Sequence, residues 1–462
     1  MTLESLPTEL FLNITANLTA DELTKLTCTC KRINALVHPL LWTNIDLYHG
    51  GYRDTSRELK VPQPFISPSP WVNHTEENAS DLFRVLEVDK PKGADRPKEL
   101  MAQVKSLCTV VEDSSSTCVW SLLPHFTNLE ALQLHGQCWH DLIDEESIPE
   151  ISAPPIPKLR FAKLSAYIPR TVAKWVIFRC GMTLERLELG LLDRPISDER
   201  CGDPKFPPLP RDAVDDSDAS DEESDYGSVT GMRVIPRPLG GFLPAKNDPG
   251  SEAQSCDSEE TFELLLPRLK HLHLSRPSEK INPGSRASYN PIDYSWSSRA
   301  DEASLADWRR ILQASSNTLE VLVLEQRPGA VEIEADSVNS PEYMRSDEAG
   351  LGSKLLIDML EELLEQEDGF RALRCVYLYG IPVGKSHGKP SEHVPGGRLM
   401  RLLERRNVTC EARLGSWCYF DDYTGEARWE REIDNEDEGE DEEDRGDVGG
   451  HPMKWDSLLA SV

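Results

Sequence analysis

The hexapeptide "LEALQL", residues 129–134, carries the pattern that decides the fold of this chain, because the pattern recurs along the sequence. It has the form L-x-x-L-x-L, with apolar and other residues alternating towards its end. Such alternation predicts a short strand with its leucines on one face. Close copies occupy residues 184–189, 269–274 and 319–324, and looser ones residues 83–88, 104–109, 159–164 and 373–378.

The flanks of the hexapeptides favour strands over helices, since leucine at positions i and i+3 would suit either. Turn-forming residues follow within a few positions, as at Gly136, Gly190 and Gly380. Helical patterns fill intervals at residues 171–181, 305–316 and 354–366. This alternation resembles a leucine-rich repeat solenoid, made irregular by uneven spacing and insertions. A doubly wound α/β domain and unrelated local matches remain alternatives.

Residues 3–18, "LESLPTELFLNITANL", predict an amphipathic helix near the start of the chain. Pro7 suits the first helical position, and Leu10, Ile14 and Leu18 follow on one stripe. The segment has no continuous apolar core and no cleavage site, so we do not expect a secretory signal. Its apolar side should therefore be buried against something.

Two further helices are expected before residue 47. Thr19 and Glu22 form a capping-box pair that would begin the second helix, and the third would begin near Thr29. Pro39 would interrupt the third helix. Three short leucine-rich helices cannot bury all their apolar surface among themselves, and the surplus is typical of a docking face.

Residues 6–48 resemble an F-box, the helical module that docks on the Skp adaptor of cullin-based ubiquitin ligases. The match runs through Leu6-Pro7, Glu9, Ile14, Leu18, Leu23, Leu26, Cys30, Lys31-Arg32 and Leu41-Trp42. Ile33 stands where the family often has an aromatic residue. The resemblance implies adaptor contacts by Leu6, Pro7, Leu10, Ile14, Leu18, Leu23, Leu26, Cys30, Leu41 and Trp42. An ordinary N-terminal helical cap is the alternative.

Two acidic stretches have a composition typical of disorder. Residues 212–225 hold eight acidic residues and residues 434–444 hold nine, with few hydrophobic ones. Ser220 precedes three acidic residues and could suit an acid-directed kinase, although a solvated linker without such a role is the simpler interpretation. Residues 416–432 predict a hairpin similar to part of a WW domain. Its tryptophans are too close together for that domain, so we expect a hairpin that caps the last repeat.

The predicted fold class is α/β: an N-terminal three-helix F-box, then an irregular leucine-rich-repeat-like solenoid, with disordered acidic insertions and tail. The F-box covers residues 1–47. The repeat-like region covers residues 80–190 and 261–432, the latter including the hairpin. The acidic insertion covers residues 191–260 and the acidic tail residues 433–462.

Composition limits the classes of partner. A formal net charge of −30 argues against nucleic acid and against anionic membrane surfaces. No apolar run is long enough for a membrane span. Eleven cysteines without zinc-site spacing read as reduced thiols, so we expect a cytoplasmic or nuclear protein, or both, without metal or cofactor.

No catalytic motif stands in a supporting context, so we do not expect an enzyme. His271 and His273 would share one strand face and could hold a metal, but an exposed polar pair is the preferred interpretation. A hydrolase would need a nucleophile elbow, which the sequence lacks.

The sequence predicts the substrate receptor of a Skp–cullin–F-box ubiquitin ligase, resembling F-box proteins of the fungal type with irregular leucine-rich repeats. The alternative is an adaptor-binding structural scaffold without a ubiquitination role. An unidentified target protein would contact the strand face opposite the leucines, unless loops do the binding. The candidate target-binding residues are Arg186, Glu188, His271, His273, Val321, Val323 and Tyr377.

Overall fold

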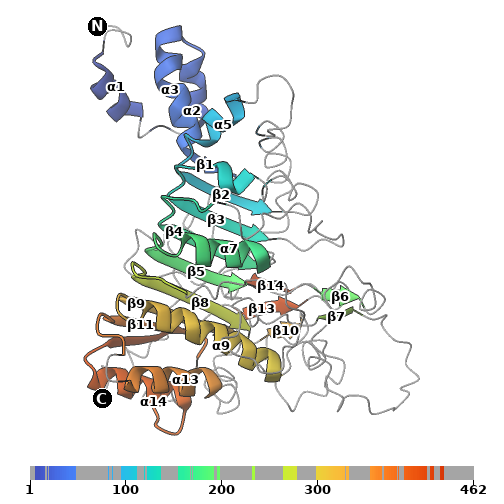
Figure 1. The fold of residues 1–462 in the computed structure, drawn as a ribbon, viewed down its shortest axis with the longest axis vertical. Coiled ribbons are helices and arrows are strands. Elements are labelled where there is room, and N and C mark those ends of the chain that lie inside the picture. The colour runs from blue at the N-terminus through green and yellow to red at the C-terminus, as the bar shows by residue number, and fades with distance from the viewer. Residues whose placement is uncertain are drawn as a thin grey trace, which may run out of the picture. The chain divides into compact units, whose positions relative to one another are not determined.

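A computed structural model gives the fold of the chain, in which helices accompany parallel strands (Figure 1). The described residues divide into two compact units, one formed by those up to residue 163 and one by those from residue 164 onwards. The structure describes residues 6–15, 18, 20–47, 82, 86, 95–111, 119, 122–136, 154–166, 168, 170–191, 195–197, 232–234, 264–277, 298–327, 329–331, 354–366, 369–381, 383, 390–413, 417–420 and 427–430.

The first unit begins with the three predicted helices. They are α1 (Thr8–Thr15), α2 (Ala20–Thr27) and α3 (Lys31–Thr43). One buried side chain from α1, one from α2 and two from α3 form their shared core, namely Phe11, Leu23, Ile33 and Val37. Cys30 is the N-cap of α3, since its Sγ accepts from the Ile33 N–H at 3.5 Å. Thr19 lies outside the described residues, so the capping box stays a prediction.

The prediction that Pro39 interrupts the third helix is wrong, because α3 continues through Pro39 to Thr43. A proline removes one backbone donor from a helix. Here Leu36, Leu40 and Leu41 pack against the core of the three helices on both sides of Pro39. This packing outweighs the loss of one hydrogen bond.

Three parallel strands of the first unit follow these helices. They are β1 (Asn44–Asp46), β2 (Ser106–Val111) and β3 (Ala131–Gly136), with β2 between the other two. Helix α5 (Asp95–Met101) precedes β2, and the short 3-10 helix η3 (Leu123–His125) precedes β3. Strand β4 (Phe161–Ala166) begins in this unit, where the Phe161 N–H donates to the Glu130 carbonyl at 3.0 Å. The hexapeptides at residues 104–109, 129–134 and 159–164 thus contain strands, as predicted.

The looser hexapeptide at residues 83–88 is not a strand where it can be described. Leu86 lies within it and Leu82 directly precedes it, and both are helical. The other residues of this hexapeptide lie outside the described part of the chain. Turn-forming Pro91 follows this hexapeptide as well, so the flanking residues did not separate strand from helix here.

In the second unit, the described part of the main sheet contains five complete parallel strands whose order follows the chain. They are β5 (Arg186–Leu191), β8 (His271–Pro277), β9 (Val321–Arg327), β11 (Cys375–Tyr379) and β12 (Thr409–Arg413). Strand predictions at residues 184–189, 269–274, 319–324 and 373–378 are confirmed. The order of these five strands does not reverse, whereas a doubly wound sheet has a reversal point. The chain is therefore an α/β protein with a parallel sheet, and its assignment as a leucine-rich repeat solenoid stays a prediction.

Helices precede most of these strands. They are α7 (Arg170–Cys180), α9 (Ser298–Ser315), α13 (Lys354–Glu365) and α14 (Pro395–Arg405). The register aligns Leu272 with Leu322 and Leu322 with Val376, so the apolar ladder is continuous on one face. Leu322 and Val376 share an apolar lining with Leu360 of α13 and Leu399 of α14, which places these helices on the leucine face.

The pair of α14 and β12 was not predicted. The sequence holds usable signals for both: Pro395 stands at the first helical position, and Val408, Cys410 and Ala412 alternate as in a strand. Because β12 lacks the L-x-x-L-x-L form, a search for that form passes over it.

Two small sheets complete the described residues. Strands β6 (Pro195–Ser197) and β7 (Met232–Val234) pair within the segment expected to be disordered, most of which lies outside the described residues. The predicted hairpin is confirmed as β13 (Trp417–Phe420) and β14 (Ala427–Glu430). It pairs with β10 (Gly329–Val331) instead of extending β12. The tail from residue 433 lies outside the described part of the chain.

Candidate functional site

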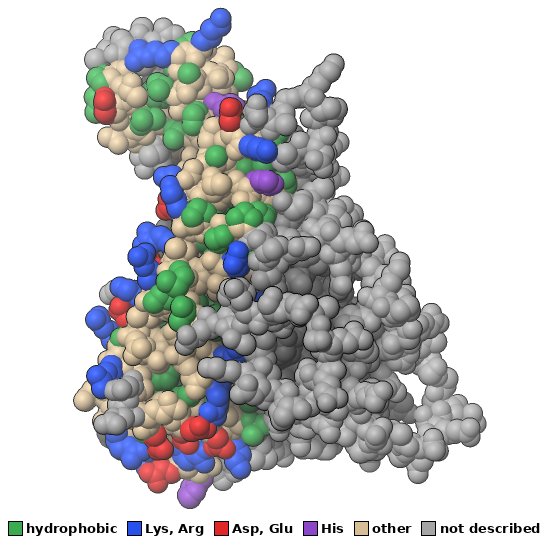
Figure 2. Space-filling model, in the orientation of Figure 1, with side chains coloured by type: hydrophobic (Ala, Val, Ile, Leu, Met, Phe, Trp, Pro, Cys, Tyr) green, Lys and Arg blue, Asp and Glu red, His purple; other side chains and the backbone are tan. Residues whose placement is uncertain are grey.

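Helix α1 exposes large apolar side chains. Its buried residues are Phe11 and Thr15, one turn apart. Leu10 and Ile14 also stand one turn apart but on the neighbouring stripe, and they are 53% and 50% exposed. Figure 2 shows hydrophobic side chains at the surface of the N-terminal helices. These side chains are available for contact with another protein, which makes this stripe of α1 the candidate interaction surface.

The other candidate adaptor residues differ in their burial. Pro7 is exposed, and the half-buried residues are Leu6, Leu18, Leu26, Cys30, Leu41 and Trp42. Leu23 is buried in the core of the three helices, so it supports their packing instead of offering a contact. The Leu6 carbonyl accepts from Arg32 Nη2 at 3.1 Å, which ties the segment before α1 to α3.

In the second unit, the candidate target-binding residues share one sheet face, as their alternation predicted. Register pairs Arg186 with His271, and Glu188 with His273. The same two rows continue to Val321 and Val323 on β9, and Val323 is paired with Tyr377 on β11. This face is opposite the leucine ladder.

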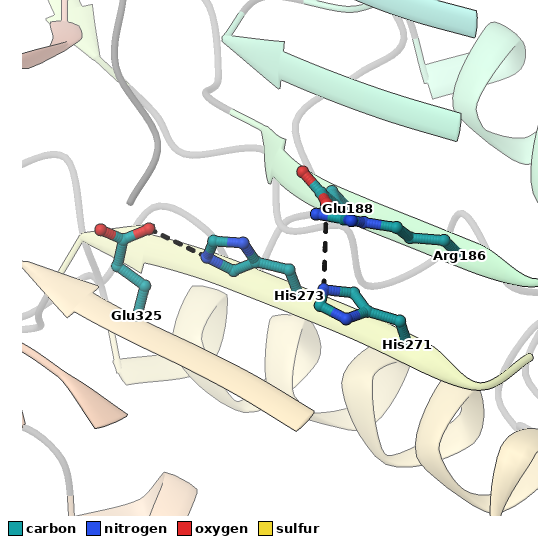
Figure 3. Close-up of polar contacts among 5 residues, drawn as sticks. All are labelled: Arg186, Glu188, His271, His273 and Glu325. Atoms are coloured by element: carbon teal, nitrogen blue, oxygen red, sulfur yellow. Dashed lines mark hydrogen bonds and ion pairs between the residues drawn. The ribbon is translucent and has the colours of Figure 1, made fainter. Parts of the chain in front are cut away.

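The polar half of this face is a network of acids and bases (Figure 3). Arg186 donates to Glu188 on the same strand. Glu188 Oε1 lies 3.8 Å from His271 Nε2. On the next strands, His273 Nε2 lies 3.1 Å from Glu325 Oε2, with side chains 1% and 0% exposed. Each of these carboxylates therefore faces an imidazole or guanidinium group, as buried polar groups require a partner.

The other half of the face is apolar and aromatic. Val323, Tyr377 and Tyr379 form a buried cluster, against which Val321 and Cys375 pack. Sequence reasoning missed Glu325 and Tyr379. Both lie two residues beyond a predicted position, on the same face, so continued alternation would have found them.

We expected this face to be open to a target protein, with His271 and His273 as an exposed polar pair. The structure differs, because Glu188, His273, Val323 and Tyr377 are buried and Arg186, His271 and Val321 are half-buried. Paired polar groups can be buried without a large desolvation penalty, which the alternation pattern alone does not reveal. Whether these residues contact a target stays a prediction.

In the first unit, His135 of β3 is a further buried titratable group. Burial lowers its pKa, and the nearby charge of Lys163 on β4 lowers it further, to about 3. The imidazole is thus neutral at neutral pH. The neutral His135 side chain is therefore part of the buried interior of the sheet. No motif in the sequence assigns it a function.

Metal and membrane features were sought in the same described ranges. They contain no group of three or more His, Cys, Asp or Glu residues that could hold a metal ion. None of their helices is long and apolar enough to cross a membrane. The cysteines whose state the structure describes are free thiols.

No curated protein matches this sequence. The model of the family described as F-box-like matches residues 3–48, which are about the residues predicted as an F-box and contain α1, α2 and α3. Domains of this family typically bind the Skp adaptor of cullin-based ubiquitin ligases. The chain therefore carries an F-box-like domain at residues 3–48.

Proposed function

We propose that this chain is the substrate-recognition subunit of a Skp–cullin–F-box ubiquitin ligase, of the fungal type. The F-box-like domain docks on the Skp adaptor and, through it, on the cullin. The observation that carries the proposal is the match at residues 3–48 together with the exposed Leu10 and Ile14 of α1. These two side chains are available to a partner without any change in the fold of the three helices.

The α/β region holds the target protein in this proposal. Its parallel strands form an irregular leucine-rich-repeat-like array, supported by the recurring leucine register. A receptor needs no catalytic residues of its own, because it brings the target close to a ubiquitin-charged enzyme and so raises the local concentration of the reactants. We place the protein in the cytoplasm, the nucleus or both.

The expected energetic share of α1 follows from its exposed area. Fully burying a leucine or isoleucine side chain contributes about 1.5–3 kcal/mol, and truncation to alanine removes most of that. Because Leu10 and Ile14 are already about half buried, about half of that is left to gain on docking, and replacing both should weaken adaptor binding roughly ten- to a hundredfold, since about 1.4 kcal/mol corresponds to a tenfold change.

The test is co-purification and affinity measurement with the Skp adaptor. The double variant Leu10→Ala/Ile14→Ala should lose the adaptor under conditions that retain the unaltered chain. A matched control is Met182→Ala/Leu355→Ala, which truncates two similarly exposed apolar side chains in the second unit. If both double variants bind the adaptor as the unaltered chain does, α1 is not the docking surface.

The alternative function is an adaptor-binding structural scaffold without a ubiquitination role. The burial of Val323 and Tyr377 favours it, because a target would have to displace whatever encloses them. A reconstituted complex with cullin, adaptor and captured partner separates the two functions. Transfer of ubiquitin to the partner supports the receptor, and stable capture without transfer supports the scaffold.

A further inference from the structure

A row of charged residues precedes the strands, at the position after the first apolar residue of each hexapeptide that contains a strand. Its members alternate strictly in sign along the chain. We name this set the charged row, and it consists of Lys105, Glu130, Arg160, Glu185, Lys270, Glu320 and Arg374. Neither the apolar ladder nor the proposed function requires a charge at this position, and neither requires alternation.

The backbone brings neighbouring members of the row together. In the second unit, the Lys270 N–H donates to the Glu185 carbonyl at 2.8 Å, and the Glu320 N–H to the Lys270 carbonyl at 2.8 Å. The Arg374 N–H donates to the Glu320 carbonyl, also at 2.8 Å. In the first unit the Glu130 N–H donates to the Lys105 carbonyl at 2.8 Å. Within each unit, these members thus lie beside the member from the adjacent strand.

The side chains form ion pairs along this edge. Glu320 lies between two cations, with oxygens 3.3 Å from Lys270 Nζ and 3.8 Å from an Arg374 guanidinium nitrogen. In the first unit, Lys105 Nζ lies 3.9 Å from Glu130 Oε1. Lys270 and Arg374 are largely exposed, and exposed ion pairs contribute little to stability. A contribution to the free energy of unfolding therefore does not explain the charged row.

Strand order is a problem that the leucine ladder leaves unsolved. Every strand presents nearly the same apolar pattern, so β9 could dock beside β5 in good register with β8 left out. Chain length does not prevent this error, since doubling a loop costs only about 0.6 kcal/mol. The interval between Glu185 and Lys270 is itself long, so β9 could pair with β5 before β8 does.

Alternating charge discriminates against this error. Docking β9 beside β5 would bring Glu320 to Glu185, and docking β11 beside β8 would bring Arg374 to Lys270. We infer that the charged row specifies the order of the strands within each unit, because there each correct neighbour meets the opposite charge and each neighbour that skips one strand meets the same charge. Like charges directly opposite on adjacent strands are unfavourable.

The ends of the row agree with this inference. The Lys105 N–H donates to the carbonyl of Thr43, an uncharged residue that directly precedes β1. At the other end, the pairing of Cys375 with Thr409 places the uncharged Val408 opposite Arg374. The positions that flank the charged row at its two ends are thus uncharged.

Refolding of the full chain tests the inference. Glu320→Lys places a cation between Lys270 and Arg374, whereas Glu320→Gln only removes two weak pairs. After dilution from denaturant at low salt, we expect Glu320→Lys to recover at least twofold less native protein than Glu320→Gln. In about 1 M salt the Debye length shrinks to about 3 Å, and the difference should close.

Two measurements exclude a simple loss of stability. Glu404→Lys makes the same charge change at an exposed site on α14 outside the row, and it should refold like the unaltered chain. Carbodiimide added after refolding should form a zero-length cross-link between Lys270 and Glu320 in the unaltered chain. This cross-link reports directly that the two strands are neighbours. The inference is overturned if Glu320→Lys and Glu320→Gln refold with equal yield at low salt. It is equally overturned if Glu404→Lys is as defective as Glu320→Lys.

Discussion

In the F-box-like domain the apolar side chains of Leu10 and Ile14 stand in solvent, whereas in the second unit the ionisable side chains of His273 and Glu325 are enclosed. The helical domain buries a few large apolar side chains in a small core and leaves other large apolar side chains exposed. The sheet instead encloses polar groups by pairing them with one another. One region leaves large apolar side chains half exposed, and the other pairs its enclosed polar groups with one another.

The difference separates two kinds of evidence for function. An exposed apolar side chain costs little in folding and points outwards to another protein. A buried ion pair is weak evidence of stability, but its loss is severe because one charge is then left without a partner. Replacing the exposed apolar side chains of the helices should therefore weaken binding of a partner. Replacing the buried polar side chains of the sheet should instead lower the free energy of unfolding.

The largest expected effect is at Glu325. Replacing it by Ala leaves His273 enclosed without its carboxylate partner, and losses of this type cost about 3–5 kcal/mol of unfolding free energy. Urea denaturation of the full chain measures it. The double variant His273→Leu/Glu325→Leu should recover much of that loss, since apolar replacements remove both polar partners together.

An exposed ion pair supplies the control for this prediction. Arg309 of α9 and Glu362 of α13 form two hydrogen bonds, of 2.7 and 2.6 Å, at the surface. Glu362→Ala should change the urea midpoint little, because solvent takes the place of the lost carboxylate. Equal effects at Glu325 and Glu362 would contradict the distinction between enclosed and exposed charge.

A second, smaller effect concerns acid. The pKa of His135 is lowered from its usual value to about 3, mainly by burial and then by Lys163. Between pH 6.5 and pH 3 the unfolded chain binds a proton that the folded chain does not, so the contribution of His135 falls as pH falls. The slope reaches about 1.4 kcal/mol per pH unit.

His135→Gln isolates this contribution from the carboxylates that titrate in the same range. The variant should lose stability less steeply than the unaltered chain between pH 6.5 and pH 4.5, with a difference of roughly 2–3 kcal/mol over that interval. Thermal or urea unfolding at several pH values gives both slopes. Parallel slopes would show that His135 becomes protonated in the folded chain and is not enclosed.

The strands were predictable because their signal is local. Leu269, Leu272 and Leu274 with a neighbouring turn are enough to place β8, and each further copy repeats the argument. The three N-terminal helices were predictable for the same reason, since short-range apolar spacing and Pro7 define α1. The prediction at Pro39 was wrong because the loss of one helix hydrogen bond is a local effect. The packing that outweighs this loss involves all three helices.

The polar network was not predictable, because it depends on contacts between distant segments. His273 and Glu325 are separated by 52 positions, and nothing near either residue indicates the other. Alternation places side chains on a face but does not say whether that face is open. The register between strands, which the sequence does not state, is what turns His273 from an expected surface residue into an enclosed one.

The smallest expected effect on stability is at Ile14. It is half exposed on α1, so Ile14→Ala removes little buried area, and we expect the unfolding free energy to change by no more than about 0.5 kcal/mol. Phe11 is three positions away on the same helix and nearly fully buried. Phe11→Ala should cost about 3–5 kcal/mol by leaving a cavity in the core of the three helices. Urea unfolding, followed by a probe in the N-terminal helices, compares the two. A large loss for Ile14→Ala would mean that the side chain is already covered within this chain. Its surface would then be unavailable to an adaptor, and the contrast between an incomplete helical domain and a self-contained sheet would fail at its first residue.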